Sequence, residues 1–180
     1  MSNNILNKSR CYLIGAMEFA NGQPWRNYTK DALKDTGITF FDPYHKPFLN
    51  SEDEDDEARK QYKEWIKNSE FDKVSEFAKR LRADDLRLCD ISDFFIVQIN
   101  PTIASWGSAE ELTTINRAKK PIFMFIEGGK TKCPLWIFGM IPHKYIYNSV
   151  DEIIDVIKNI NSGQKEIDSD RWHLLKKEYR

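Results

Sequence analysis

Two continuous apolar runs with a short helical stretch between them constrain the fold of this chain most strongly. The first run, FFIVQI, covers residues 94–99 and ends at the turn-like pair Asn100-Pro101, and the second run covers residues 122–126. Unbroken apolar runs of this length are typical of strands that are buried on both faces. The segment that starts near Gly107 is predicted to be a short helix. The sequence therefore predicts a strand, a loop, a helix and a strand, with any chemistry at the loop after the first strand.

The same alternation continues along the rest of the chain. Apolar runs predict further strands at residues 11–15, 38–41 and 144–147. Helical spacing and cap residues predict a helix that starts at Pro24, and a last amphipathic helix that starts after Ser149. Alternating strands and helices indicate an α/β domain with a parallel sheet. We expect one domain over all 180 residues.

Charge and composition exclude several classes of function. The formal net charge is −1, so no field draws the chain onto a nucleic-acid polymer or an anionic membrane. No run approaches the ~20 apolar residues of a membrane span, and the start of the chain has no signal-peptide core. The three cysteines form no CxxC pair and the three histidines are scattered, so we expect a cytoplasmic protein without a metal site. Neither GxGxxG nor a P-loop lysine is present, so we expect no bound cofactor.

Acidic residues gather around the central strand. Glu110 and Glu111 stand side by side near the start of the helix predicted after that strand. An acid at this place offsets the helix dipole, which explains one of the two but not both. Four aspartates lie within ten residues just before the strand. A buried carboxylate is costly unless it is paired or has a function, so Asp85 is either paired with Arg82 or Arg87 or belongs to a site.

Two loops and one adjacent pair of residues carry open alternatives. Residues 43–50 (PYHKPFLN) either line a pocket or cover the core. Trp25 and Arg26 are either a core tryptophan beside a surface arginine, or residues that reach over the first loop towards a ligand. The six consecutive acids at residues 52–57 are interpreted as a solvated loop and helix start.

Two longer segments fall outside the simple alternation. Residues 52–83 are interpreted as a helical insertion, either one broken helix or two helices, which forms an edge of the pocket or an oligomer contact. Residues 163–180 form a C-terminal tail that is polar except for a few apolar residues such as Trp172. The tail is expected to dock on its own subunit or on a neighbour.

Three short pieces of sequence together resemble one enzyme family. Residues 12–16 (YLIGA) are similar to the family's first strand and ligand loop. Asp85-Leu86, followed by Asp93, is similar to its D-L-x6-D entry to the third strand. Residues 107–112 (GSAEEL), followed by an apolar strand, are similar to its G-x-x-x-E-L stretch. In this order and spacing, the chain resembles the nucleoside 2-deoxyribosyltransferase family and the related 2'-deoxynucleoside 5'-monophosphate N-glycosidases.

The resemblance implies a flavodoxin-like three-layer fold with a five-stranded parallel sheet and helices on both faces. With the alternation described above, it predicts the strand order 2-1-3-4-5, with Gly15, Asp85 and Glu111 together at the carboxyl ends of strands. It implies that Glu111, which directly precedes Leu112, is the catalytic nucleophile, and that Asp85 is the acid near the sugar and the departing base. It also implies a homo-oligomer. Substrate contacts are implied for Tyr12, Gly15, Ala16, Asp93, Ser105 and Gly107.

The implied chemistry suits these residues. A carboxylate such as Glu111 can attack the anomeric carbon as the base leaves, and a second carboxyl group shares the work through an oxocarbenium-like transition state. The leading hypothesis is therefore a transferase that passes the deoxyribosyl group of a 2'-deoxynucleoside to another nucleobase. One alternative is a 2'-deoxynucleoside 5'-monophosphate N-glycosidase, with water as the acceptor. The other is a non-catalytic nucleotide-binding protein of the same fold.

The position six residues before the nucleophile concerns the 5' end of the substrate. The resemblance implies an Asp there in the nucleoside transferases, holding the 5'-hydroxyl, and a Ser in the monophosphate glycosidases, contacting the phosphate. This chain has Ser105. Its first loop, Met17-Glu18-Phe19, lacks the Arg and Gly residues of the glycosidases, and the charge of Glu18 would oppose a phosphate. Both a nucleoside and a nucleotide substrate therefore stay open.

Overall fold

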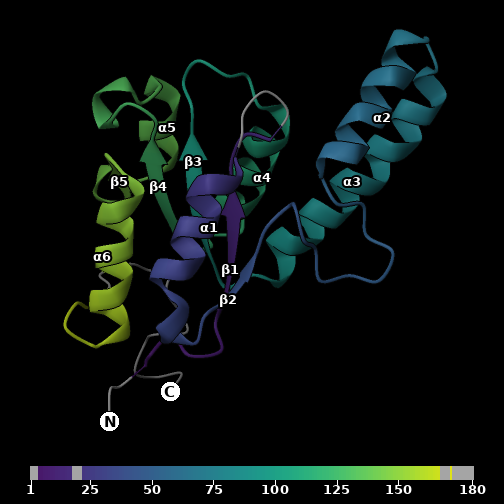
Figure 1. The fold of residues 1–180 in the computed structure, drawn as a ribbon. Coiled ribbons are helices and arrows are strands. Elements are labelled where there is room, and N and C mark those ends of the chain that lie inside the picture. The colour runs from purple at the N-terminus through teal and green to yellow at the C-terminus, as the bar shows by residue number, and fades with distance from the viewer. Residues whose placement is uncertain (1–3, 18–21, 167–170, 172–180) are drawn as a thin grey trace.

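Five parallel strands form one sheet in the order β2-β1-β3-β4-β5 in a computed structural model, which describes residues 4–17, 22–166 and 171 (Figure 1). The predicted strand order is confirmed. β5 is shorter than the expected residues 144–147, because the chain after Pro142 first makes a single 3-10 turn, His143–Tyr145. The strands are β1 (Arg10–Ile14), β2 (Thr39–Phe41), β3 (Phe94–Ile99), β4 (Ile122–Ile126) and β5 (Ile146–Tyr147).

Helices cover both faces of the sheet, which gives the expected three-layer α/β arrangement (Figure 1). One face packs against α1 and α6, and the other against α3, α4 and α5. Among the described residues, no helix is long and apolar enough to cross a membrane. The α-helices of the described residues are α1 (Gln23–Ala32), α2 (Asp56–Lys67), α3 (Phe71–Ile91), α4 (Trp106–Arg117), α5 (Leu135–Met140) and α6 (Val150–Asn161).

The side chains of β1 alternate between the two cores. Cys11 and Leu13 pack on the side of α1 and α6, whereas Tyr12 and Ile14 pack on the side of α3, α4 and α5. All four are buried, which explains why the strand appears in the sequence as an unbroken apolar run. Tyr12 is fully buried although it carries a hydroxyl group, so this hydroxyl needs a hydrogen-bond partner inside the protein.

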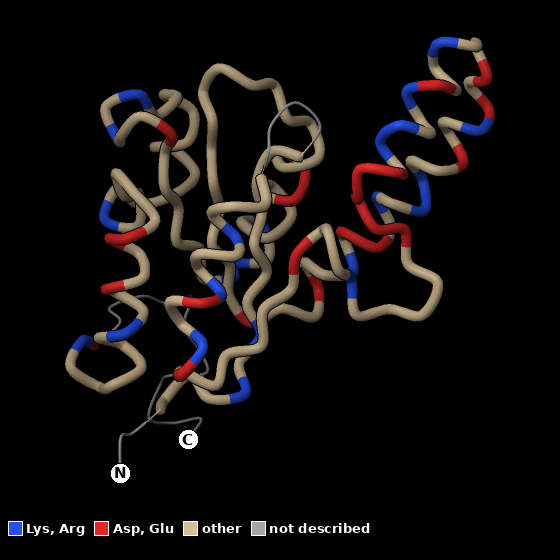
Figure 2. The backbone as a smooth tube through the Cα atoms, in the orientation of Figure 1, with Lys and Arg blue, Asp and Glu red and all other residues tan. Residues whose placement is uncertain are grey.

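The insertion consists of two helices, α2 and α3, which form a hairpin that projects from the sheet (Figure 1). Lys, Arg, Asp and Glu are distributed along both helices (Figure 2), and no residue of α2 is buried. Ring contacts hold the hairpin together, because the rings of Tyr62 and Trp65 each lie 6.1 Å from the ring of Phe77. The Asp55 side chain caps α2 by accepting a hydrogen bond from the backbone N–H of Ala58 at 2.8 Å.

α3 continues beyond the end expected for the insertion and becomes the crossover helix that leads into β3. The apolar residues Phe77, Leu81 and Leu88 continue one stripe at helical spacing, and Leu88 and Cys89 pack against the sheet. Asp85 therefore lies on a helix, six residues before the last residue of α3, Ile91. This position places Asp85 nearer to the carboxyl ends of the strands than the last residue of α3 is.

Candidate active site

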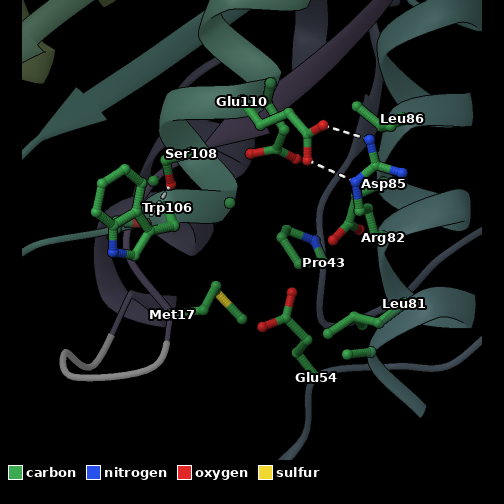
Figure 3. Close-up of a pocket in the computed structure, with 15 residues that line it drawn as sticks. Met17, Pro43, Glu54, Leu81, Arg82, Asp85, Leu86, Trp106, Ser108 and Glu110 are labelled. Atoms are coloured by element: carbon green, nitrogen blue, oxygen red, sulfur yellow. Dashed lines mark hydrogen bonds and ion pairs between the residues drawn. The ribbon is translucent and has the colours of Figure 1, made fainter. Parts of the chain in front are cut away.

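A cavity of about 360 Å³ lies at the carboxyl ends of β1 and β3. Its walls are the loop after β1, the segment between β2 and α2, one side of α3 and the start of α4 (Figure 3). The three residues expected to converge, Gly15, Asp85 and Glu111, all line it. The complete lining is Gly15, Met17, Pro43, Glu54, Ala78, Leu81, Arg82, Asp85, Leu86, Ser105, Trp106, Gly107, Ser108, Glu110 and Glu111.

Glu111 is a buried carboxyl group at the edge of this cavity. It lies in the second turn of α4 and is 7% exposed. The Tyr12 hydroxyl donates a hydrogen bond to its Oε1 atom at 2.6 Å, which gives the buried tyrosine its partner. Burial raises the pKa of Glu111 to about 8, the charge of Asp85 adds to the rise, and the hydrogen bond from Tyr12 opposes it. Glu111 is therefore held in one orientation by β1.

Glu110, the neighbour of Glu111, is in a different environment. Adjacent helical residues point about 100° apart, so the two carboxyl groups leave α4 in different directions. The Arg82 guanidinium on α3 pairs with Glu110, with its Nε atom 2.7 Å from Oε2, and lowers the pKa of Glu110 through these hydrogen bonds (Figure 3). The Glu110 side chain is 40% exposed. It is an ion-paired carboxylate at the rim of the cavity.

Asp85 is paired with a lysine and not with an arginine. The Lys46 ammonium lies 2.8 Å from Asp85 Oδ1, and the Lys46 side chain is fully buried. Burial raises the pKa of Asp85, whereas Lys46 opposes the rise. Of the two alternatives for Asp85, the pairing with Arg82 or Arg87 is not found, because Arg82 pairs with Glu110 and the Arg87 guanidinium lies 4.2 Å from the centre of the Phe48 ring.

Glu54 is a cavity residue that the sequence interpretation missed. The six acids at residues 52–57 were expected to be solvated, which holds for Asp55, Asp56 and Glu57 but is wrong for Glu54. The backbone N–H of Glu54 donates to the carbonyl of Pro43 at 3.0 Å, and this bond folds the segment back over the cavity. Burial, followed by the charge of Asp85, raises the pKa of Glu54 to about 7. No local sequence signal distinguishes Glu54 from its acidic neighbours.

The first loop is held from inside by Arg26, which is fully buried. Its guanidinium donates to the carbonyls of Leu13 at 3.1 Å, Gly15 at 2.9 Å and Gly22 at 2.8 Å. Both sequence interpretations of Arg26, a surface residue or a ligand-reaching residue, are therefore wrong. A Cβ atom at position 15 would lie 3.1 Å from Gln98 Cβ, so Gly15 allows the loop to approach β3 closely.

The remaining residues of the first loop differ in their access to the cavity. Tyr12 and Ala16 are buried and do not line the cavity, although Tyr12 reaches it through its bond to Glu111. Met17 lines the wall beside Trp106 (Figure 3). Glu18, the acid expected to oppose a phosphate, lies outside the described residues.

The start of α4 contributes small and polar residues to the cavity. Ser105 is the N-cap residue, and its hydroxyl donates to the Ser108 hydroxyl at 2.9 Å, so no side chain caps the first backbone N–H groups of the helix. A Cβ atom at Gly107 would meet nothing within 4 Å, so the backbone is open there. Trp106, which the sequence analysis did not single out, lines the cavity although it is 86% exposed. An exposed indole at the mouth of a cavity offers a flat apolar surface to a ligand.

Asp93 does not belong to this group of residues. Its carboxylate accepts hydrogen bonds from the backbone N–H of Arg10 at 2.8 Å and from the Arg10 guanidinium at 3.1 and 3.2 Å. Both residues lie at the amino ends of β1 and β3, whereas the cavity lies at the carboxyl ends. The expectation that Asp93 contacts a substrate in this cavity is therefore wrong, because the helix that carries Asp85 separates the two aspartates along the strand direction.

Comparison of the chain with solved structures shows that its fold is a known one. A 2-deoxyribosyltransferase from the psychrotolerant bacterium Bacillus psychrosaccharolyticus matches with a TM-score of 0.52 and 18% sequence identity, over 82% of this chain and 91% of that one. The chain shares that enzyme's fold. The CMP N-glycosidase BcmB of Clostridium botulinum matches with a TM-score of 0.46 and 15% identity, over 83% of this chain and 98% of that one. No family model and no curated protein matches the sequence.

Carboxyl groups outnumber cations in the lining of the cavity, where Arg82 is paired with Glu110 at the rim. Within the part of the chain that the structure describes, no three His, Cys, Asp or Glu side chains form a group that could hold a metal ion. Glu54, Asp85 and Glu111 border one space, and Lys46 is in contact with only one of them, Asp85. The charge of Asp85 raises the pKa of both Glu54 and Glu111, and the charge of Glu54 raises the pKa of Glu111, since burial weakens screening by water. The cavity therefore favours a ligand that carries or develops positive charge.

Proposed function

We propose that the protein cleaves the N-glycosidic bond of a 2'-deoxynucleoside and passes the deoxyribosyl group to another nucleobase, with Glu111 as the nucleophile. The observation that carries the proposal is the buried Glu111 carboxyl group, held by the Tyr12 hydroxyl at 2.6 Å beside a cavity that also contains Asp85. The shared fold with a 2-deoxyribosyltransferase supports it. Glu110 is less suited to attack a sugar, because Arg82 occupies its carboxylate.

In the proposed reaction, a Glu111 oxygen attacks the anomeric carbon while the base departs. The sugar then passes through a cationic, oxocarbenium-like transition state, which a cluster of buried carboxylates stabilises more than it stabilises the neutral substrate. The Asp85 carboxylate, held by Lys46, provides a fixed negative charge beside that cation. A 2'-hydroxyl would withdraw electrons from the cation and crowd the nucleophile, so the substrate is a 2'-deoxy sugar.

A 2'-deoxynucleoside 5'-monophosphate is the second candidate substrate, and one observation favours it. Ser105 lines the cavity at the start of α4, where no side chain caps the first N–H groups. Free N–H groups and the dipole at a helix N-terminus favour an anion such as a phosphate. Base release from this substrate would be a hydrolysis if water reaches the glycosyl-enzyme, and a transfer if a second base does.

The test is to incubate the protein with the four deoxynucleosides and their 5'-monophosphates, each with and without a different free base, and to separate the products by chromatography. Exchange of bases supports the transferase, and release of base without exchange supports the N-glycosidase. The matched control is Glu111→Gln, which keeps the size of the side chain and an acceptor for Tyr12. No turnover of any substrate, with saturable nucleotide binding, would identify a non-catalytic binding protein instead. The expected homo-oligomer stays a prediction.

A further inference from the structure

Apart from Glu110, which pairs with Arg82 at the rim, the carboxyl groups of the cavity differ in what holds them. Glu111 accepts a hydrogen bond from Tyr12, and Asp85 has the Lys46 ammonium at 2.8 Å. Among the described residues, no group donates a hydrogen bond to the Glu54 carboxyl group and no cation forms an ion pair with it. Glu54 is therefore the carboxyl group of the cavity that is free to exchange a proton with a ligand.

The contact with Lys46 makes Asp85 a poor proton donor. Protonation of Asp85 would leave the buried Lys46 ammonium without its counter-charge, and an unpaired buried charge is strongly unfavourable. Glu54 has the opposite preference, because burial and the charge of Asp85 both favour its neutral form and raise its pKa to about 7. Charged groups on other elements also act on Glu54: Asp85 favours its neutral form, and Lys46, Arg26 and Arg59 favour its ionised form. The charge of Glu54 in turn raises the pKa of Glu111.

The position of Glu54 relative to α4 matches the path of a leaving group. The Glu54 carboxyl group points into the cavity from the wall opposite Ser108 and Glu110, residues of the helix that carries Glu111 (Figure 3). When a nucleophile on α4 attacks one face of the sugar, the base leaves from the opposite face. The departing base is therefore directed towards the wall that carries Glu54.

We propose that Glu54 is a catalytic residue, the general acid that protonates the departing nucleobase and the general base of the second half-reaction. The inference rests on the proposed function. In the first step, a Glu111 oxygen forms a bond to the anomeric carbon, the C–N bond breaks, and its electron pair goes to the base nitrogen. The Glu54 proton passes to the base, so the base leaves as a neutral molecule and Glu54 becomes a carboxylate. In the second step, the Glu54 carboxylate takes a proton from the incoming base or water as that nucleophile forms a bond to the anomeric carbon. The ester bond to Glu111 breaks and its electron pair returns to the carboxylate, so both residues are restored.

The experiment compares substrates that need a proton with substrates that do not. A deoxyguanosine methylated at N7 releases a neutral base without protonation, whereas deoxyguanosine itself needs a proton. If only pyrimidines are accepted, 5-fluorodeoxyuridine, which leaves as a stable anion, is paired with deoxyuridine. Glu54→Gln is expected to lower kcat about 100-fold for the substrate that needs the proton, and less than about threefold for its activated partner. The matched control is Glu52→Gln, two residues away on the same segment, paired with Arg80 and outside the cavity lining.

The pH profile provides a second readout that a structural role would not change. In the wild type, kcat for deoxyguanosine should have a bell-shaped pH profile, because Glu111, with a pKa of about 8, must be ionised and Glu54, with a pKa of about 7, must be protonated. The fall on the high-pH side reports the loss of the Glu54 proton and should be absent in Glu54→Gln. Equal slowing of both substrates by Glu54→Gln, or an unchanged fall with pH, overturns the role of Glu54 and leaves the proposed function intact. Failure of the wild type on both substrates overturns the proposed function and this inference together.

Discussion

The amino ends of the strands (the amino edge) and their carboxyl ends (the carboxyl edge) arrange charged groups in opposite ways. At the amino edge, the Asp93 carboxylate is bound by the backbone and the guanidinium of Arg10. Nearby, the Lys120 ammonium donates to the carbonyls of Cys89 and Ser92 at the end of α3, at 2.7 and 2.9 Å. At the carboxyl edge, four carboxyl groups line one cavity: Arg82 pairs with Glu110, Lys46 contacts Asp85, and Glu54 and Glu111 have no ion pair among the described residues.

The comparison separates residues that stabilise the fold from residues whose arrangement costs stability. Satisfied charges at the amino edge join β1, β3 and the end of α3, so they are expected to contribute to folding and not to catalysis. Crowded carboxyl groups at the carboxyl edge raise each other's pKa and disfavour the folded state at high pH. Strongly perturbed groups in a cleft are typical of functional sites. Substitutions at the two edges should therefore change different measurable quantities.

The largest effect is expected at the carboxyl edge, from Glu111→Gln. The amide cannot form the glycosyl ester, so kcat should fall by about 10⁴-fold or more, the scale of removing a nucleophile. The fold should persist, because the glutamine oxygen still accepts the hydrogen bond from Tyr12. Steady-state kinetics and thermal unfolding of the same preparations measure both quantities.

Glu110→Gln is the matched control for this substitution, since it makes the same change at the adjacent, preceding residue. Glu110 pairs with Arg82 at the rim of the cavity, so its kcat should change by less than about threefold. Mass spectrometry of a trapped deoxyribosyl adduct should locate it on Glu111. An adduct on Glu110 would show that the wrong carboxylate has been assigned.

At the amino edge, Asp93→Ala should reduce stability without changing catalysis. The substitution removes the acceptor of the Arg10 backbone N–H and of its guanidinium, which is expected to cost about 2–3 kcal/mol of unfolding free energy. The kcat and KM of the folded protein should not change, because Asp93 lies at the opposite edge from the cavity. Asp93→Asn, which keeps one acceptor oxygen, should cost less. An increase in KM at unchanged stability would show that Asp93 contacts the substrate.

The cost of the crowded carboxyl groups should be visible in the pH dependence of stability. The pKa of Glu54 is raised from 4.5 to about 7, so the folded protein holds a proton that the unfolded chain releases. The corresponding stability is present below pH 4.5 and is lost as pH rises through about 7. Glu54→Gln removes this loss, and with partial exposure taken into account it should be more stable than the wild type by about 2 kcal/mol at pH 8 and about equally stable at pH 4.

Urea unfolding at the two pH values tests this expectation. Glu52→Gln, which removes a surface carboxylate paired with Arg80, should show no gain that depends on pH. A gain of the same size at both pH values for Glu54→Gln would mean that packing, and not the charge of Glu54, is responsible.

The fold was predictable because parallel strands are buried on both faces. The predicted runs at residues 94–99 and 122–126 coincide with β3 and β4, where an apolar residue on either face satisfies one of the two cores. The choice of Glu111 over Glu110 rested on a resemblance, and the role of Glu111 stays a prediction. Local sequence does show that two adjacent helical residues cannot face the same way.

The parts of the site that escaped prediction depend on contacts between distant segments. Lys46 is buried because its ammonium meets Asp85 on α3, and Glu54 enters the cavity because its backbone bonds to Pro43. Neither contact can be predicted from the residues next to Lys46 and Glu54 in the sequence, because these residues form a loop and a run of acids. The error at Asp93 has a geometric cause: a rise of ~1.5 Å per residue places Asp85 ~9 Å along α3 from the end of that helix, towards the carboxyl edge. Asp85 and Asp93 are only eight residues apart in sequence, but they lie at opposite ends of the strands.

The smallest effect, and the one that addresses the substrate, is expected from Ser105→Asp. Aspartate is a good N-cap residue, so the variant should fold at least as well as the wild type, and the substitution changes mainly the charge at the start of α4. If the substrate is a 5'-monophosphate, this charge should lower kcat/KM for the monophosphate about tenfold, or about 1.4 kcal/mol, and spare the deoxynucleoside. Ser105→Asn is the matched neutral control and should leave both substrates within about threefold, because it caps the helix without adding charge. If the substrate is a deoxynucleoside, the added carboxylate can hold its 5'-hydroxyl and should preserve or improve kcat/KM. Equal losses on both substrates would show that Ser105 does not contact the 5' end.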